Sequence, residues 1–236
     1  MTLLEAIDIR SSIRDFDAAP VSKKQIREIG KLIDEYNGEA NLNILWLDDA
    51  GSAFDSFFKS YGMFKGIRSV IVLKSPTSTP DFAEKLGYYG EMLVLNTVAL
   101  GLGTCWVGGT FDKKDPAFGI KEDEQIAAVI PVGHPTDEAK QKPPRKKKKV
   151  KKLYMSDSES PGWFLAGMDA VSKAPSAVNL QPVKFYYISG VTWAKTKSKS
   201  VMASLDRGIA KAHFDIAANG SFEFGPVGIF SKKEEK

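Results

Sequence analysis

The chain has 236 residues, of which 43% are hydrophobic and 26% charged, and its formal net charge at pH 7 is +4. This composition is typical of a soluble globular protein with one large domain or two small ones. No segment approaches the about eighteen apolar residues of a membrane-spanning helix, and charges at Glu5, Asp8 and Arg10 argue against a signal peptide. We therefore expect a cytoplasmic protein with no membrane partner.

The cysteine and histidine content argues against a disulfide and a metal site. Cys105 is the one cysteine, and the histidines, His134 and His213, are too far apart in the sequence to form a zinc site by themselves. The apolar segment LGLGTCWVGG around Cys105 favours a buried inert thiol over a nucleophile, because no base or cation is evident nearby.

Much of the net positive charge comes from one run, RKKKKVKKL at 145–153. Such a run is typical of a solvated loop. A nucleic-acid-binding patch is the alternative, but the run has no interleaved aromatic residues and no recognisable reading module, so we expect no nucleic-acid partner. A phosphate-bearing cofactor would need only one or two of these charges.

Helix and strand patterns alternate irregularly along the chain. The capping boxes TLLE at 2–5 and SKKQ at 22–25 begin two helices, the second predicted to end at Asn37-Gly38. The later patterns predict strands at 41–47 and 69–74, a buried helix at 86–103, strands at 104–108 and 126–135, a helix at 161–173, a strand at 183–189, a helix at about 203–218, and a strand-like run at 222–230. This irregular order favours an α+β fold over a doubly wound sheet.

A weak internal repeat divides the chain into predicted halves, 1–150 and 151–236. Each half has the order helix, polar link, Asn-Leu and strand, which matches Asn41-Leu42 with Asn179-Leu180. Two unrelated α+β halves would also produce such a match. If the repeat is real, the chain resembles a dimer fused into one polypeptide.

The motif IRSSIRDF at 9–16 gathers side chains suited to a phosphate. Arg10 and Arg14 are four residues apart, with Ser11 and Ser12 between them. Guanidinium and hydroxyl donors of this kind can hold a dianionic phosphate without a glycine-rich loop. The alternative is structural: Arg10 would meet the negative end of a helix dipole, and spacing alone does not separate the two.

The segment APSAVNLQP at 174–182 joins a helix-like run to a strand-like run. Taken alone it is a loop, since Pro, Ser and Asn are ordinary turn residues. Together with IRSSIRDF, ALGLGTCWVGG, and VIPVGHP followed by a basic segment, it resembles the nitroreductase family. That resemblance implies a flavoprotein that binds FMN, with a central, mainly antiparallel sheet flanked by helices.

The order of the motifs departs from the family pattern. The Pro-Ser loop usually precedes the GLGTCW motif, whereas here it follows. In homodimeric members this loop reaches the flavin of the other subunit, so the order resembles the branch in which two nitroreductase-like halves are joined. The second half lacks a counterpart of IRSSIRDF, because SDSESPG stands there instead. The resemblance therefore implies one FMN per chain and a monomer that imitates the family's dimer.

The resemblance also assigns FMN contacts. It implies that Arg10, Ser11 and Ser12 hold the phosphate, and that Arg14 lies near the ribityl chain or the N1/O2 edge of the ring. A cation at that edge raises the flavin potential, because reduction places negative charge there.

Further contacts follow the later motifs. Gly108 and Gly109 correspond to the place where a backbone N–H faces flavin N5 and where a side chain would block hydride approach. Arg145 corresponds to the basic residue that returns to the phosphate, with Lys147 as a helper. In the loop, Pro175 fixes the backbone, Ser176 contacts phosphate or ribityl oxygens, and Asn179 supplies a donor and an acceptor to the ring edge; these contacts complete the implied site.

The implied activity is a ping-pong transfer of hydride from NADH or NADPH through the flavin to a small electrophile such as a nitroaromatic or a quinone. No acid–base side chain is required, so no catalytic residue is named. The alternative is a non-catalytic FMN-binding or storage protein. In that case NAD(P)H would not bleach the bound flavin. A basic scaffold for nucleic acid is a further alternative, and it predicts a colourless protein.

Overall fold

The computed structural model describes residues 1–17, 19–50, 54, 64–141 and 148–233. The chain divides into two compact units. Unit 1 comprises residue 1 and residues 9–82 and 93–145, and unit 2 comprises residues 2–8, 83–92 and 146–236. Helix α4 contributes to both units.

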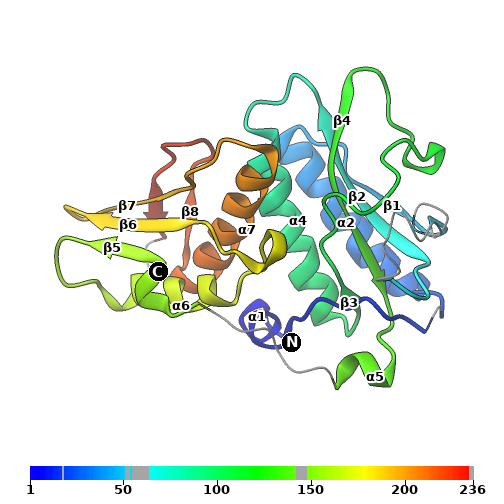
Figure 1. Ribbon diagram of the computed structural model, residues 1–236, viewed down its shortest axis with the longest axis horizontal. Coiled ribbons are helices and arrows are strands. Elements are labelled where there is room, and N and C mark those ends of the chain that lie inside the picture. Colours follow the sequence, from blue (N-terminus) through cyan, green and yellow to red (C-terminus); the bar gives the residue numbers. More distant parts are fainter. Residues whose placement is uncertain (18, 51–53, 55–63, 142–147, 234–236) are drawn as a thin grey trace. The chain divides into compact units, whose positions relative to one another are not determined.

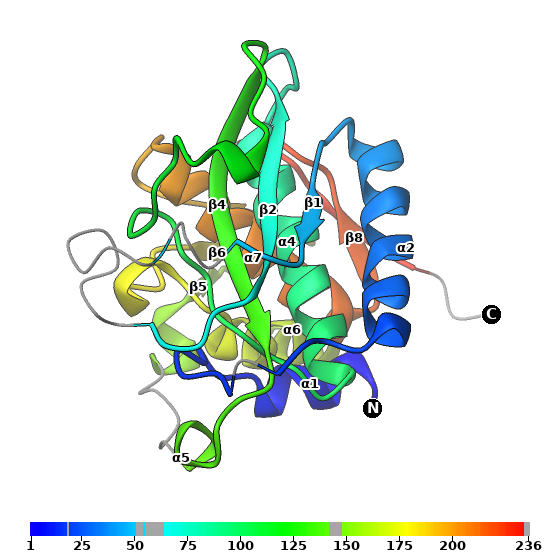
Figure 2. The same cartoon turned by 90° about the vertical axis from the view of Figure 1, so that its right-hand side faces the viewer.

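Unit 1 is built around a four-stranded antiparallel sheet with the order β1-β2-β4-β3 (Figures 1 and 2). Its elements are α2 (Lys23–Ala40), β1 (Leu45–Leu47), β2 (Ser69–Pro76), the last turns of α4 (Phe82–Ala99), β3 (Gly103–Thr104), η2 (Pro116–Phe118), β4 (Glu124–Gly133) and α5 (Asp137–Lys140). The two long strands, β2 and β4, read as nearly continuous apolar runs because they are buried along almost their whole length. Their valines and isoleucines form the unit's aliphatic core.

Helix α2 begins at its predicted cap but extends beyond its predicted end. Ser22 and Gln25 form the capping box, and the helix ends at Ala40 with Asn41 in the left-handed conformation. Asn37 does not stop the helix, because its side chain bonds both backbone groups of Ile44 at 2.8 Å. The polar side chain thus ties the helix to the start of β1.

The predicted helix at 86–103 is displaced toward the N-terminus. α4 ends at Ala99, and Gly101 follows with a φ of 83°, a conformation that favours glycine. Gly103 is already in β3, where a Cβ would lie 2.9 Å from Cγ1 of Ile13. The glycines therefore belong to the turn and the strand.

Unit 2 combines helices with two small sheets. Its elements are most of α1 (Leu3–Ile9), residues 83–92 of α4, η3 (Val150–Lys152), β5 (Tyr154–Ser156), α6 (Gly162–Lys173), η4 (Ala177–Asn179), β6 (Lys184–Ile188), β7 (Val191–Lys195), α7 (Val201–Ala218), β8 (Gly220–Phe222) and β9 (Phe230–Lys232). β5 pairs parallel with β6, β6 pairs antiparallel with β7, and β8 pairs antiparallel with β9.

The strand prediction was incomplete in this unit. β5 and β7 were not predicted, and the run at 222–230 is not one strand: it ends β8 and begins β9, with Gly225 at a φ of 103° between them. Because glycine readily adopts a positive φ, the chain turns here. The predicted α+β class is confirmed, and no helix among the described residues is long and apolar enough to cross a membrane.

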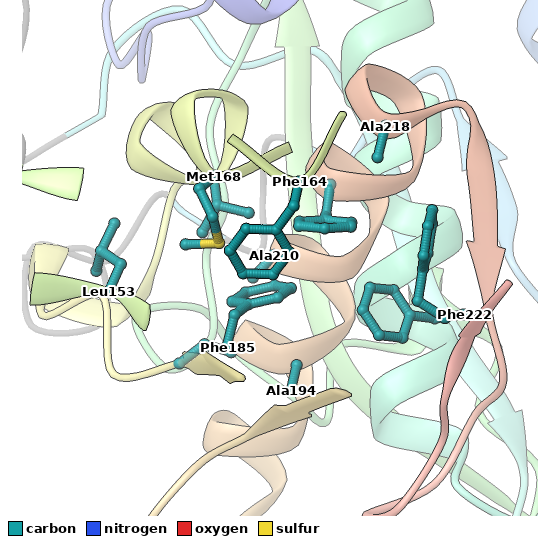
Figure 3. Close-up of a cluster of buried hydrophobic side chains, with 12 residues drawn as sticks. Leu153, Phe164, Met168, Phe185, Ala194, Ala210, Ala218 and Phe222 are labelled. Carbon is teal, nitrogen blue, oxygen red and sulfur yellow. The ribbon is translucent and has the colours of Figure 1, made fainter. Parts of the chain in front are cut away.

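The core of unit 2 is mainly aromatic (Figure 3). Phe185 and Phe214 stack with ring centroids 5.1 Å apart, and Phe164 meets Phe214 at 5.5 Å. Helix α7 crosses residues 83–92 of α4 with their backbones in contact. A Cβ on Gly208 would lie only 2.0 Å from the Glu84 carbonyl oxygen, so glycine is required at this crossing.

Candidate functional site

In unit 1 the IRSSIRDF segment lies beside the GLGTCWVGG segment. Ser12 forms a parallel bridge with Thr104, and the Ile13 N–H donates to the Thr104 carbonyl at 2.9 Å. The side chain of Ile13 packs against Gly103, where only glycine leaves room. Two motifs about ninety positions apart in the sequence are thus adjacent. Cys105 is buried, as predicted, and its inertness stays a prediction.

A pocket of about 240 Å³ opens next to this junction. Arg10 and Ser11 line it together with Lys140, which the sequence analysis missed. The rest of the lining is mostly apolar or glycine: Met1, Ile9, Ile13, Val98, Gly101, Leu102, Gly103 and Pro135. Two cationic side chains and a hydroxyl at one apolar pocket form a donor set suited to an anion.

The remaining residues of the motif lie elsewhere. Ser12 and Arg14 are half-buried and are not among the residues that line this pocket. The Arg14 guanidinium lies over the ring of Phe64, 5.9 Å from its centroid. In an extended segment successive side chains point to opposite sides, which separates Arg14 and Ser12 from Ser11. The four residues therefore do not converge on one point in this structure.

Two observations near the junction bear on whether a bound group fits. Thr104 Oγ1 is buried and has no hydrogen-bond partner among the described residues. Gly109 is exposed, and a Cβ built on it would meet nothing within 4 Å, whereas Gly108 is half-buried. An unsatisfied hydroxyl and open space beside a glycine are compatible with a polar, ring-shaped group such as FMN.

The loop 174–182 lies in unit 2 and has an unusual backbone. Val178, Asn179 and Gln181 have φ values of 43°, 59° and 42°. This region costs a β-branched residue such as valine of order 1–2 kcal/mol. The Ser176 hydroxyl oxygen accepts a hydrogen bond from the Gln181 N–H at 2.7 Å. Pro175, Ser176 and Asn179 are half-buried.

Asp206 supports the loop from α7. Its carboxylate accepts a hydrogen bond from the Ala177 N–H at 3.0 Å. Burial raises the pKa of Asp206 to about 6, although the Ala177 bond acts in the opposite direction. No local sequence pattern marks Asp206, because its partner is almost thirty positions away. Predicted contacts Arg145 and Lys147 lie outside the described residues.

Unit 2 also buries a set of charged side chains. Glu84 forms ion pairs with Arg207 at 2.6 Å and with Lys211. His213 places one ring nitrogen 2.8 Å from Glu91 and the other 3.1 Å from the Ala170 carbonyl. No group of three His, Cys, Asp or Glu side chains within the described part of the chain is arranged to hold a metal ion.

Solved structures define the fold class. A crystal structure described as a "putative nitroreductase" from Thermotoga maritima MSB8 aligns with a TM-score of 0.67 at 22% identity, covering 98% of this chain and 92% of that one. One described as a "Putative NADH Oxidase" from Clostridium acetobutylicum aligns with a TM-score of 0.51 at 19% identity, covering 63% and 96%. At these identities the likeness shows the fold, which is the nitroreductase-like α+β fold.

A family model shows the membership. The model described as "Putative TM nitroreductase" matches residues 2–218. The chain belongs to this nitroreductase family, a group of oxidoreductases by its name. No curated protein matches the sequence.

Proposed function

We propose that the protein is an FMN-dependent oxidoreductase that uses NADH or NADPH to reduce a small electrophile such as a nitroaromatic or a quinone. The observation that carries this proposal is the pairing of Ser12 with Thr104, which sets IRSSIRDF beside GLGTCWVGG within unit 1. Bound FMN would supply two-electron transfer between the nicotinamide and the acceptor. The protein would bind and orient the reactants.

The residues of unit 1 support distinct roles. Arg10 and Ser11, joined by Lys140, provide the donors for the phosphate. Arg14 does not line that pocket, and the family resemblance gives it the cation near the ribityl chain or the N1/O2 edge. Gly109 leaves space in which a ring could lie, because apart from its chain neighbours no atom of the described residues would lie within 4 Å of a Cβ there.

The other predicted contacts are proposals on the family resemblance. They are Ser12, Gly108, Arg145, Lys147, Pro175, Ser176 and Asn179. We also propose that the protein acts in the cytoplasm as a monomer without a nucleic-acid partner, and that halves 1–150 and 151–236 form a pseudo-dimer holding one FMN.

The test is an FMN titration followed by visible absorption, comparing the wild type with Arg10→Ala. Loss of a charge-assisted hydrogen bond costs about 1.5–3 kcal/mol, so FMN affinity is expected to fall roughly 10- to 100-fold. Arg68→Ala is the matched control, because Arg68 is exposed and does not line the pocket. A wild-type protein that stays colourless in excess FMN would contradict the proposal.

Addition of NAD(P)H to the FMN-loaded protein then separates an enzyme from a storage protein. Bleaching of the flavin absorption near neutral pH, reversed by a quinone, is expected of the enzyme. Gly109→Val sharpens the test, because the added side chain meets no protein atom near its Cβ and should leave folding unchanged. It should slow bleaching or weaken FMN binding if the ring lies there.

A further inference from the structure

The first described residue of the basic run, Lys148, contacts the loop 174–182 within unit 2. Its backbone N–H donates to Oε1 of Gln181 at 2.9 Å. Its ammonium group donates to the carbonyl oxygen of Leu180 and, at 3.0 Å, to that of Gln181. Lys148 therefore makes three hydrogen bonds to two consecutive loop residues, which a solvated loop would not require.

The loop conformation explains why an ammonium group is suited to this position. Gln181 has a positive φ, and the carbonyls of Leu180 and Gln181 converge on one point rather than alternating as in an extended strand. Two converging carbonyl dipoles repel each other unless a cation lies between them. A lysine ammonium is compact, carries a full charge and has three donors.

The loop also forms local hydrogen bonds and hydrogen bonds to α6 and α7. Asn179 and Leu180 donate their N–H groups to the carbonyls of Ser176 and Ala177, which any tight turn can provide. The Gln181 amide nitrogen donates to the Ser172 carbonyl at 2.8 Å, which fixes the end of the loop to α6. Among these contacts, only the Lys148 ammonium group bonds the carbonyl oxygens of both Leu180 and Gln181.

We propose that Lys148 is a positioning residue: its ammonium group holds loop 174–182 in the left-handed conformation and thereby presents Asn179 to its ligand. The part of this inference that concerns the ligand rests on the proposed function, in which Asn179 contacts the FMN ring. Lys148, the first described residue of the basic run, then has a specific structural role. Lys149 is exposed, and its side chain forms no hydrogen bond to the described residues.

Backbone amide hydrogen exchange of the full chain tests the loop directly, without FMN. Lys148→Ala should accelerate exchange at the amides of Ala177–Gln181 about three- to tenfold, because two hydrogen bonds from a charged, partly exposed donor are lost. Lys149→Ala should leave the same amides unchanged, and Lys148→Arg should restore most of the protection. Unchanged exchange in Lys148→Ala would overturn the proposal.

FMN titration of the same variants tests the positioning role. We expect Lys148→Ala to raise the FMN dissociation constant about three- to tenfold, with recovery in Lys148→Arg and no change in Lys149→Ala. Faster exchange with an unchanged dissociation constant would overturn the positioning role. If the wild type binds no FMN, the proposed function fails, and the exchange data alone decide whether Lys148 holds the loop.

Discussion

Both units bury ionisable side chains, but they accommodate them differently. In unit 1, Lys74 and Glu124 form an ion pair of 2.8 Å, and Glu124 also accepts hydrogen bonds from Asn43 and from the Lys121 N–H. In unit 2, Asp215 accepts bonds from Tyr88 and the Phe222 N–H, both at 3.0 Å. Its Oδ1 atom is buried and has no hydrogen-bond partner among the described residues. The Glu124 carboxylate is therefore better satisfied than that of Asp215, although Glu84 of unit 2 is also paired, with Arg207 and Lys211.

The pKa values of the two carboxyl groups move in opposite directions. Burial by itself raises the pKa of Glu124, but the hydrogen bonds from Lys74, Lys121 and Asn43 outweigh it and hold the pKa below 4.5. Burial raises the pKa of Asp215 to about 7, and its hydrogen bonds do not compensate. Glu124 is therefore stabilised as a charged carboxylate, whereas burial favours the neutral acid at Asp215.

The consequences for stability have opposite signs. The contribution of Glu124 is present above its ordinary pKa of 4.5 and is lost as the pH falls below it. Asp215 binds its proton more tightly in the folded state, so its contribution decreases as the pH rises from about 4 to about 7. Asp206, with a pKa raised to about 6, acts in the same direction as Asp215.

Breaking the buried Lys74–Glu124 ion pair of unit 1 should lower the free energy of unfolding more than any other change proposed here. Lys74→Met leaves Glu124 buried without its cation, so the free energy of unfolding should fall by about 3–5 kcal/mol in urea denaturation at pH 7. Lys31→Met is the control, because the Lys31–Glu28 pair is exposed and should contribute no more than about 0.5 kcal/mol. Equal losses in the two variants would contradict the role given to the buried pair.

The second prediction concerns the packing of helices. Gly208→Ala in unit 2 should lower the free energy of unfolding by about 3 kcal/mol, because the new Cβ overlaps the Glu84 carbonyl and the helices must separate. Gly30→Ala in α2 of unit 1 should instead raise it by roughly 0.5–1 kcal/mol, since nothing lies within 4 Å and alanine favours the helix. If the free energy of unfolding changed in the same direction in both variants, the close approach of α4 to Gly208 would not explain the effect.

The smallest effect tests the unsatisfied carboxyl group. Asp215→Asn imitates the neutral acid, so at pH 8 it should raise the free energy of unfolding by about 2 kcal/mol. The gain should fall to less than half at pH 5, where the folded wild-type side chain is protonated but the unfolded chain has still lost most of its proton. Urea denaturation at pH 8 and pH 5 measures the change in the free energy of unfolding. An equal gain at both pH values would mean that the effect does not come from titration of Asp215.

Local signals in the sequence predicted many of the elements. The capping boxes of α1 and α2 and the apolar faces of α6 and β6 depend on residues close together in the chain. The sequence does carry a signal for β7, the turn dipeptide Ser189-Gly190, and in the structure both residues have the positive φ of a hairpin turn. The three-residue strand β5 had none, because it pairs in parallel with a strand thirty positions later.

The candidate site was predictable where a motif marks it. The motifs located Arg10, Ser11 and the glycine pair, but not Lys140, whose signal is an ordinary exposed lysine at the end of a short helix. The contact between Lys148 and the loop was missed for the same reason. The partners of Lys148 are more than thirty positions away, and the sequence does not distinguish Lys148 from the other lysines of the basic run.

Local patterns in the sequence were enough to predict most helices and long strands, the α+β class and the resemblance to the nitroreductase family. These features depend on side-chain pattern and on capping residues, which act over a few positions. Which charges are buried, which carboxyl groups prefer the neutral form and how the loop 174–182 is held follow from the folded arrangement. Those properties depend on desolvation and on partners brought together from distant parts of the chain, and a one-dimensional pattern contains neither.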